Sequence, residues 1–77
     1  MKVTLISFGK ISEFIHNQEL EIGPINNTDL LKTHLEQVFP NLAGIKYKLA
    51  INKVMVQSPQ KLSEEDVIAI MPPFSGG

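Results

Sequence analysis

The last seven residues of the chain, Met71-Pro72-Pro73-Phe74-Ser75-Gly76-Gly77, combine types that suit chemistry at the terminus itself. The two prolines fix φ and favour an extended polyproline conformation, so the segment loses less entropy when it binds. The two glycines lack Cβ atoms and can pass through a channel that larger side chains would block. When extended, residues 72–77 span at most about 20 Å, which is enough to reach deep into another protein.

The reactive group of such a tail is the C-terminal carboxylate of Gly77. A carboxylate is a poor electrophile until it is activated. A helper enzyme with ATP could form an acyl adenylate at this carboxylate, and a sulfur donor could then displace AMP. We therefore expect a chain that other enzymes act on and that binds no cofactor itself.

The remaining side chains with catalytic or metal-binding potential lack suitable partners in the sequence. The chain contains no cysteine, which excludes a disulfide, a thiolate nucleophile and a cysteine-ligated metal. His16 and His34 have no metal-ligand spacing, and His34 lies at the rim of an apolar helix face. Glu64, Glu65 and Asp66 form a run in a polar turn, where acid groups are usually solvated. Elimination leaves the tail as the candidate site, and we expect no bound metal.

Length and composition indicate one small folded domain over residues 1–77, with residues 72–77 as its functional tail. The hydrophobic fraction of 43% is too high for a disordered chain. The net charge is −1, and the seven basic residues are lysines without a basic stripe, so we expect no nucleic-acid partner. No segment approaches the roughly 20 apolar residues of a membrane span. We therefore expect a cytoplasmic protein with no membrane partner.

The elements that must position the tail begin with two predicted strands. Residues 2–8 alternate as a strand does, and Ile6 and Phe8 share one of its two faces. A turn of uncertain conformation then leads to a second short strand over residues 18–22. Together these segments predict an N-terminal hairpin.

One amphipathic helix is predicted after these strands. Asn26, Asn27 and Thr28 offer side-chain oxygens for its N-cap, and we expect Thr28 to act as a cap. Apolar residues recur at helical spacing from Leu30 onward, and Pro40 cannot continue the helix. The pattern predicts a helix of about three turns.

Three further strands are predicted in the C-terminal half. Residues 45–51 alternate clearly, and Asn52-Lys53 then predicts a tight turn into residues 54–56. Residues 67–71 are apolar enough to be a strand buried on both sides, and they lead directly into the tail. One helix can cover one face of the sheet, so the order ββαβββ predicts an α+β fold. We expect a β-grasp, or ubiquitin-like, roll with a mixed sheet of about five strands.

The second face of this sheet has no helix to cover it. We expect Ile6, Phe8, Ile68 and Ile70 to line this face, where they would form a partner-binding patch. Apolar atoms also occupy much of any protein surface, however, so an apolar face is not by itself a binding site. The same four residues could simply fill the core. The sequence leaves both interpretations open.

The tail and the element order together resemble the small subunits of molybdopterin synthase. These are ubiquitin-like sulfur carriers whose chains typically end in Pro-Pro-x-Ser/Thr-Gly-Gly. The resemblance spans the whole chain, from ISFGKISEF through TDLLKTHL and LAINK to LSEEDVIAIMPPFSGG. Only the tail is specific, because the other segments suit many β-grasp proteins.

The resemblance implies a carrier role in molybdenum cofactor biosynthesis. Gly77 would be adenylated by an enzyme related to those that activate ubiquitin, and a sulfur donor enzyme would convert it to a thiocarboxylate. The tail would enter the active site of the large synthase subunit and bind there through Pro72, Pro73, Phe74, Ser75 and Gly76. Sulfur would then pass to cyclic pyranopterin monophosphate. The family pairs two small with two large subunits, the catalytic side chains belong to the large subunit, and only the activating partner uses ATP.

Three residues depart from the family pattern. Ser12 stands where many members have Arg, Glu65 replaces a Gly that is frequent in the last turn, and Phe74 replaces a smaller residue. The change at Ser12 removes any ion pair that the Arg makes with a partner. We expect Phe74 to act as a hydrophobic anchor in the partner's entry groove.

Other functions remain compatible with a Gly-Gly terminus. The sulfur carrier of thiazole synthesis, in thiamine production, resembles this chain in fold and in its terminal glycines but lacks the Pro-Pro-x-Ser run. A ubiquitin-like protein modifier would instead join its glycine to lysines of other proteins. A plain interaction module would lose nothing on removal of Gly77.

Overall fold

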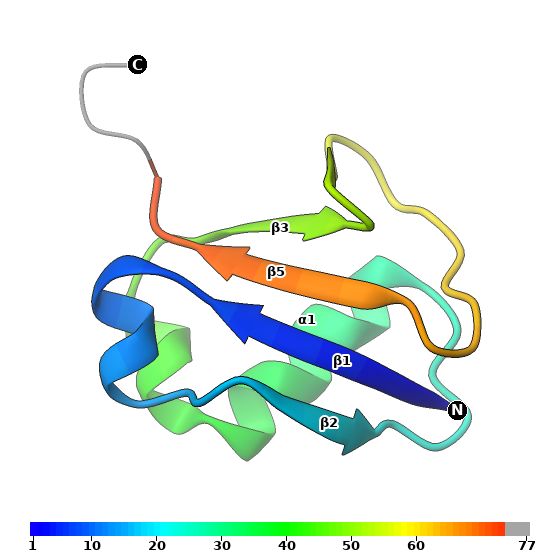
Figure 1. Ribbon diagram of the computed structural model, residues 1–77, viewed down its shortest axis with the longest axis horizontal. Coiled ribbons are helices and arrows are strands. Elements are labelled where there is room, and N and C mark those ends of the chain that lie inside the picture. Colours follow the sequence, from blue (N-terminus) through cyan, green and yellow to red (C-terminus); the bar gives the residue numbers. More distant parts are fainter. Residues whose placement is uncertain (74–77) are drawn as a thin grey trace.

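The structure of the protein is a computed structural model that describes residues 1–73. These residues form strands, one α-helix and two 3₁₀ helices in the order expected for ββαβββ (Figure 1). In chain order the elements are β1 (Lys2–Ser7), η1 (Gly9–Glu13), β2 (Gln18–Glu21), α1 (Thr28–Val38), η2 (Pro40–Gly44), β3 (Lys48–Ile51), β4 (Val54–Met55) and β5 (Val67–Met71). The strand predicted over residues 45–51 is shorter than expected, because residues 45–47 belong to the connection between η2 and β3.

The five strands form one mixed sheet in the order β2-β1-β5-β3-β4. The strands β1 and β5 are parallel neighbours, and the other three pairs are antiparallel. The last strand therefore lies in the middle of the sheet, with hydrogen-bonded neighbours on both sides. Because β1 and β5 run in the same direction, the base of the tail emerges beside the turn that follows β1 (Figure 1).

The helix α1 begins at an N-cap formed by Asn27. The Asn27 side chain accepts a hydrogen bond from the N–H of Leu30 at 2.9 Å, which satisfies one of the free donors of the first turn. The prediction that Thr28 caps the helix is wrong. Thr28 is buried, and its hydroxyl accepts a hydrogen bond from the N–H of Gln60 at 3.0 Å. This residue therefore ties the helix start to the loop before β5.

The turn between β3 and β4 is the tight hairpin predicted from its two residues. Asn52 has a φ of 49° and Lys53 a φ of 74°, and a two-residue type I′ turn needs this left-handed pair. The Asn52 side chain also accepts from the N–H of Val67 and donates to Asp66, both at 2.9 Å. The hairpin thus holds the start of β5 in place.

Glu65 lies in the turn before β5 with a φ of 66°. Its N–H donates to the carbonyl of Lys2 at 2.8 Å, so the conformation is needed to reach β1. Glycine adopts this left-handed region without a Cβ penalty. This explains why glycine is frequent at this turn in the family that the chain resembles. Glutamate at this position costs stability locally.

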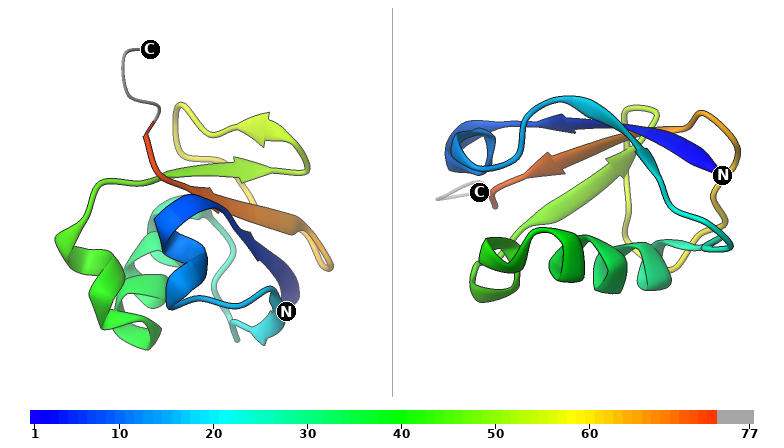
Figure 2. Two further views of the ribbon diagram at one scale, coloured as in Figure 1. Left: turned by 60° about the vertical axis from the view of Figure 1, so that its left-hand side comes forward. Right: turned by 90° about the horizontal axis from the view of Figure 1, so that it is seen from below.

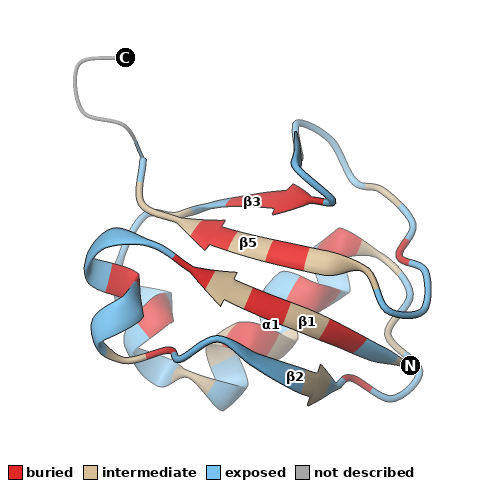
Figure 3. Ribbon diagram, in the orientation of Figure 1, coloured by how far each residue is buried: buried red, intermediate tan, exposed pale blue. Residues whose placement is uncertain are grey.

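The hydrophobic core lies between α1 and one face of the sheet (Figure 2). Side chains on alternate positions of β1 and β5 are buried, as the alternating colours of these strands show (Figure 3). The buried apolar residues come from the strands, the helix and the connecting loops, and they are Val3, Leu5, Ile11, Ile15, Ile22, Leu31, Leu35, Leu42, Leu49, Ile51, Leu62, Ile68 and Ile70.

Two residues expected on the open face belong to this core instead. Ile68 and Ile70 have no exposed surface, so the prediction that they line a partner-binding patch is wrong. The register explains the error, because Leu5 pairs with Ile68 and Leu5 faces the helix. Residues paired across neighbouring strands share a face, and a shift by one position exchanges the faces. The expectation that β5 is buried on both sides is also wrong, since its alternate residues are only partly buried.

Candidate functional site at the tail base and the outer sheet face

The base of the tail is attached to the central strand of the sheet. Pro72 follows the last residue of β5, and the N–H of Phe8 donates to the carbonyl of Ile70 at 3.1 Å just before it. On the other side of β5, Lys48 of β3 pairs with Met71. The tail is therefore anchored by two neighbouring strands up to its first residue, which gives it a defined starting point.

An apolar patch lies on the sheet face that points away from α1. We call it the outer-face patch, and its members are Ile6, Phe8, Val67, Ala69 and Met71. Phe8 is 49% exposed, while the β-strand members are partly buried. Most of this patch lines a hollow of about 320 Å³, and Phe8 and Met71 line a second hollow of about 430 Å³ with Gly9 and Pro72. The patch is thus continuous with the tail base.

The structure places two of the four residues predicted for this face on it. Ile6 and Phe8 lie on the outer face, and Val67, Ala69 and Met71 take the places expected of Ile68 and Ile70. The sequence carried no signal for these three residues, because the faces of β5 follow from its pairing with β1. That any of them binds a partner stays a prediction.

Two of the predicted tail residues lie within the described residues 1–73, and four lie outside them. Pro72 is partly buried against the turn after β1, and Pro73 is exposed. Phe74, Ser75, Gly76 and Gly77 lie outside the described residues, so their roles stay predictions.

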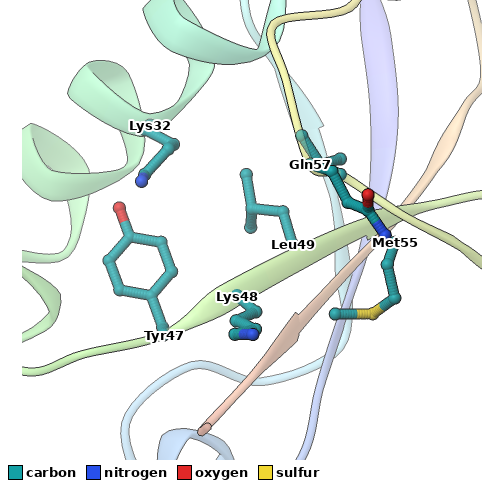
Figure 4. A pocket seen from close by; sticks show the side chains of 7 residues that line it. Lys32, Tyr47, Lys48, Leu49, Met55 and Gln57 are labelled. Atoms are coloured by element: carbon teal, nitrogen blue, oxygen red, sulfur yellow. The ribbon is translucent and has the colours of Figure 1, made fainter.

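A third hollow lies between α1 and the segments that form β3, β4 and the residues just after β4 (Figure 4). It has a volume of about 460 Å³, and its lining includes Lys32, Tyr47 and Lys48. The Lys32 ammonium lies 5.3 Å from the centre of the Tyr47 ring, a cation–π arrangement. The Tyr47 hydroxyl donates a hydrogen bond to the carboxylate of Glu36. This hollow is therefore lined by both basic and apolar side chains.

Burial, together with the hydrogen bond to Glu36, raises the pKa of the Tyr47 hydroxyl. Below the unfolded pKa of about 10, ionisation of Tyr47 should not change the free energy of unfolding. Above that value, the free energy of unfolding should fall as the pH rises. The sign follows because the unfolded chain ionises first. Tyr47 is the only tyrosine and tryptophan is absent, so phenolate absorbance reports on this residue alone.

The measurement compares the phenolate titration of native protein with that of protein unfolded in urea. The native midpoint should be the higher one, and Glu36→Gln should lower it part of the way because burial remains. Equal native and unfolded midpoints would show that the Tyr47 environment has been described wrongly.

Two of the other titratable residues named from the sequence accept hydrogen bonds from the backbone. The Glu64 carboxylate accepts from the N–H of Lys2 at 2.6 Å, and Asp66 accepts from the N–H of Ser63 at 2.8 Å. His16 is exposed and His34 is partly buried on α1. Within residues 1–73, no three His, Cys, Asp or Glu side chains are grouped as a metal site would need. The same residues contain no helix long and apolar enough to cross a membrane.

Comparison with known proteins gives the family. Residues 5–77 match the sequence profile described as the ThiS family, so the match takes in all of the core except Val3, the outer-face patch and the tail. The chain belongs to the ThiS family. A comparison of this ThiS-family chain with curated proteins gave no match.

The ThiS-family chain is also similar to a chain of a solved structure. That structure is the protein–protein complex of subunits 1 and 2 of the molybdopterin-converting factor from Helicobacter pylori 26695. The two chains are 25% identical, the similarity covers 100% of each, and the TM-score is 0.72. These findings identify the chain as a sulfur carrier of the ThiS family with the ubiquitin-like β-grasp fold, as its tail and element order predicted.

Proposed function

We propose that this ThiS-family chain is the sulfur-donating small subunit of molybdopterin synthase and that its reactive group is the carboxylate of Gly77. The observation that carries the proposal is the Pro-Pro-Phe-Ser-Gly-Gly tail, which leaves the central strand of the sheet beside an exposed apolar patch. The full-length similarity to a chain of the molybdopterin-converting factor complex supports the choice of pathway.

The chemistry at Gly77 requires two steps supplied by other proteins. An adenylating enzyme would bring ATP, and the carboxylate oxygen would attack its α-phosphorus and release pyrophosphate. A sulfur donor enzyme would then deliver a sulfide equivalent to the carbonyl carbon of the acyl adenylate and displace AMP. The product is a thiocarboxylate, whose sulfur would pass to cyclic pyranopterin monophosphate in the active site of the large subunit.

The chain's own residues have binding and positioning roles in this scheme. Pro72 and Pro73 restrict the backbone at the start of the tail, and the outer-face patch offers apolar surface for docking next to them. No step needs a general base from the small chain, because the partners supply the reacting groups. As an isolated chain it is therefore a carrier and not an enzyme.

The proposal is tested by the intact mass of the purified chain after incubation with an adenylating enzyme, ATP and a sulfur donor. We expect a mass increase equal to replacement of one oxygen by one sulfur, and no increase when ATP is omitted. An unchanged mass, with an enzyme that charges another ThiS-family carrier in the same assay, would refute the carrier role.

A second candidate is the sulfur carrier of thiazole synthesis, which the ThiS-family match also favours. The two candidates differ in the acceptor and not in the chemistry at Gly77. The thiocarboxylated chain should be offered separately to the large synthase subunit with cyclic pyranopterin monophosphate and to thiazole synthase with its substrates. Sulfur transfer only in the second reaction would replace our proposal with the thiamine pathway.

The outer-face patch makes a testable contribution to docking. We expect Phe8→Asp to weaken binding to the large subunit about 10- to 100-fold, because a charge would enter the centre of an apolar interface. The matched control is Leu30→Asp, since Leu30 is 50% exposed and Phe8 is 49% exposed, but Leu30 lies on α1. Titration calorimetry measures both affinities. Equal effects of the two substitutions would exclude the outer face as the docking surface.

A further inference from the structure

Gly9, the first residue of η1, lies in contact with the base of the tail. Its φ is +59°, and an added Cβ atom would come within 2.9 Å of Cγ and 3.4 Å of Cδ of Pro72. Real Cβ atoms do not approach other carbons as closely as 2.9 Å, so one of the two residues would have to move. The absence of a side chain at Gly9 is therefore what allows Pro72 to lie where it does.

Neither side of this contact can move easily. The ring of Pro72 is closed onto its own backbone, so Cγ cannot rotate away as the end of a flexible side chain would. The turn that carries Gly9 is held on both sides. The N–H of Phe8 donates to the carbonyl of Ile70 at 3.1 Å, and the hydroxyl of Ser12 donates to the carbonyl of Gly9 at 2.6 Å. Ile11, which follows in the same turn, has no exposed surface.

We propose that Gly9 is a positioning residue that sets the direction in which the tail leaves the sheet. The inference rests on the proposed function of the tail as a carrier. Pro72 and Pro73 have φ fixed by their rings, so a shift of Pro72 is passed on to the start of the tail and is not absorbed at its base. Misplacement of reacting atoms by about 1 Å can lower a rate about 100-fold. A methyl group at Gly9 would therefore change the direction in which the tail starts, although it touches only Pro72.

The chain offers a matched control for the backbone conformation. Gly23 has a φ of +62°, but an added Cβ atom there would meet nothing within 4 Å. Gly9→Ala and Gly23→Ala place alanine in the same left-handed region, and only the first brings it against Pro72. Any difference between these variants reports on the contact with the tail base and not on backbone strain.

The experiment measures the steady-state kinetics of ATP-dependent adenylation of the full chain by the adenylating enzyme. We expect Gly9→Ala to lower kcat/KM at least about 10-fold and Gly23→Ala to change it less than about 2-fold. The loss should fall on kcat more than on KM, because the substitution shifts the start of the tail and replaces no residue of the outer-face patch. Thermal unfolding midpoints of both variants establish that each is folded at the assay temperature.

A second comparison removes the atom that Gly9→Ala would meet. Pro72→Ala deletes Cγ and Cδ, so Gly9→Ala should have little further effect in a Pro72→Ala background. An equal effect of Gly9→Ala in both backgrounds, or equal kinetics of the Gly9→Ala and Gly23→Ala variants, would overturn the positioning role while leaving the carrier function intact. Failure of the wild-type chain to be adenylated would overturn the carrier function and the positioning role with it.

Discussion

Deletion of Gly77 is expected to abolish thiocarboxylate formation, with a loss of more than about 100-fold in rate. The deletion leaves a carboxylate at the terminus but moves it back along the tail by about 3.5 Å. An adenylating enzyme that positions the terminal carboxylate against the α-phosphorus of ATP cannot compensate for that distance. The intact-mass assay measures the result, because the variant should show no gain from exchange of oxygen for sulfur.

The control for this deletion is the stability of the fold. The last strand, β5, ends at Met71, so removal of Gly77 takes nothing from the sheet or its core. Thermal unfolding of the shortened chain should match that of wild type. A full gain of sulfur by the shortened chain would mean that the position of the carboxylate is not recognised, and a plain interaction module would then become the better description.

Replacement of Ile70 by alanine should have the second large effect, this time on folding. Ile70 is fully buried in β5, between its strand partners Ser7 and Leu49. Loss of a buried isoleucine side chain costs about 2–5 kcal/mol, because apolar contacts are lost and a cavity remains. That is a large share of the roughly 5–15 kcal/mol that stabilises a small domain.

Urea unfolding of wild type and Ile70→Ala measures this cost as a shift in the midpoint at constant slope. Val54→Ala is the control, because Val54 is 63% exposed at the edge of the sheet and should change the unfolding free energy by less than about 0.5 kcal/mol. Equal midpoints for the Ile70→Ala and Val54→Ala variants would place Ile70 outside the core.

Most of the architecture was predictable because it depends on local patterns. Each of these patterns depends on a few neighbouring residues: the alternation in residues 2–8, the apolar run at residues 67–71, the helical spacing after Leu30 and the turn at Asn52-Lys53. The structure confirms all of them, with small differences at the ends of elements. The two 3₁₀ helices, η1 and η2, were not predicted, because such short elements carry no strong periodicity.

Predictions that needed the pairing of distant segments were less successful. Thr28 has the side chain of a helix cap, but its neighbour Asn27 caps the helix and Thr28 binds the N–H of Gln60. The contact between Gly9 and Pro72 brings together two residues that are far apart in the sequence. No pattern of neighbouring residues predicts it. Both results depend on which loops the fold brings together.

The sequence by itself determined the family of this protein and the order of its elements. A Pro-Pro-Phe-Ser-Gly-Gly terminus and a ββαβββ order are properties of consecutive residues, and they were sufficient for the family. Only the tertiary structure decided which side of β5 faces outward. A strand has two faces that differ by one residue in register, and the parallel pairing of Leu5 with Ile68 selects between them. That pairing buries Ile68 and Ile70 and leaves Ala69 and Met71 beside the tail.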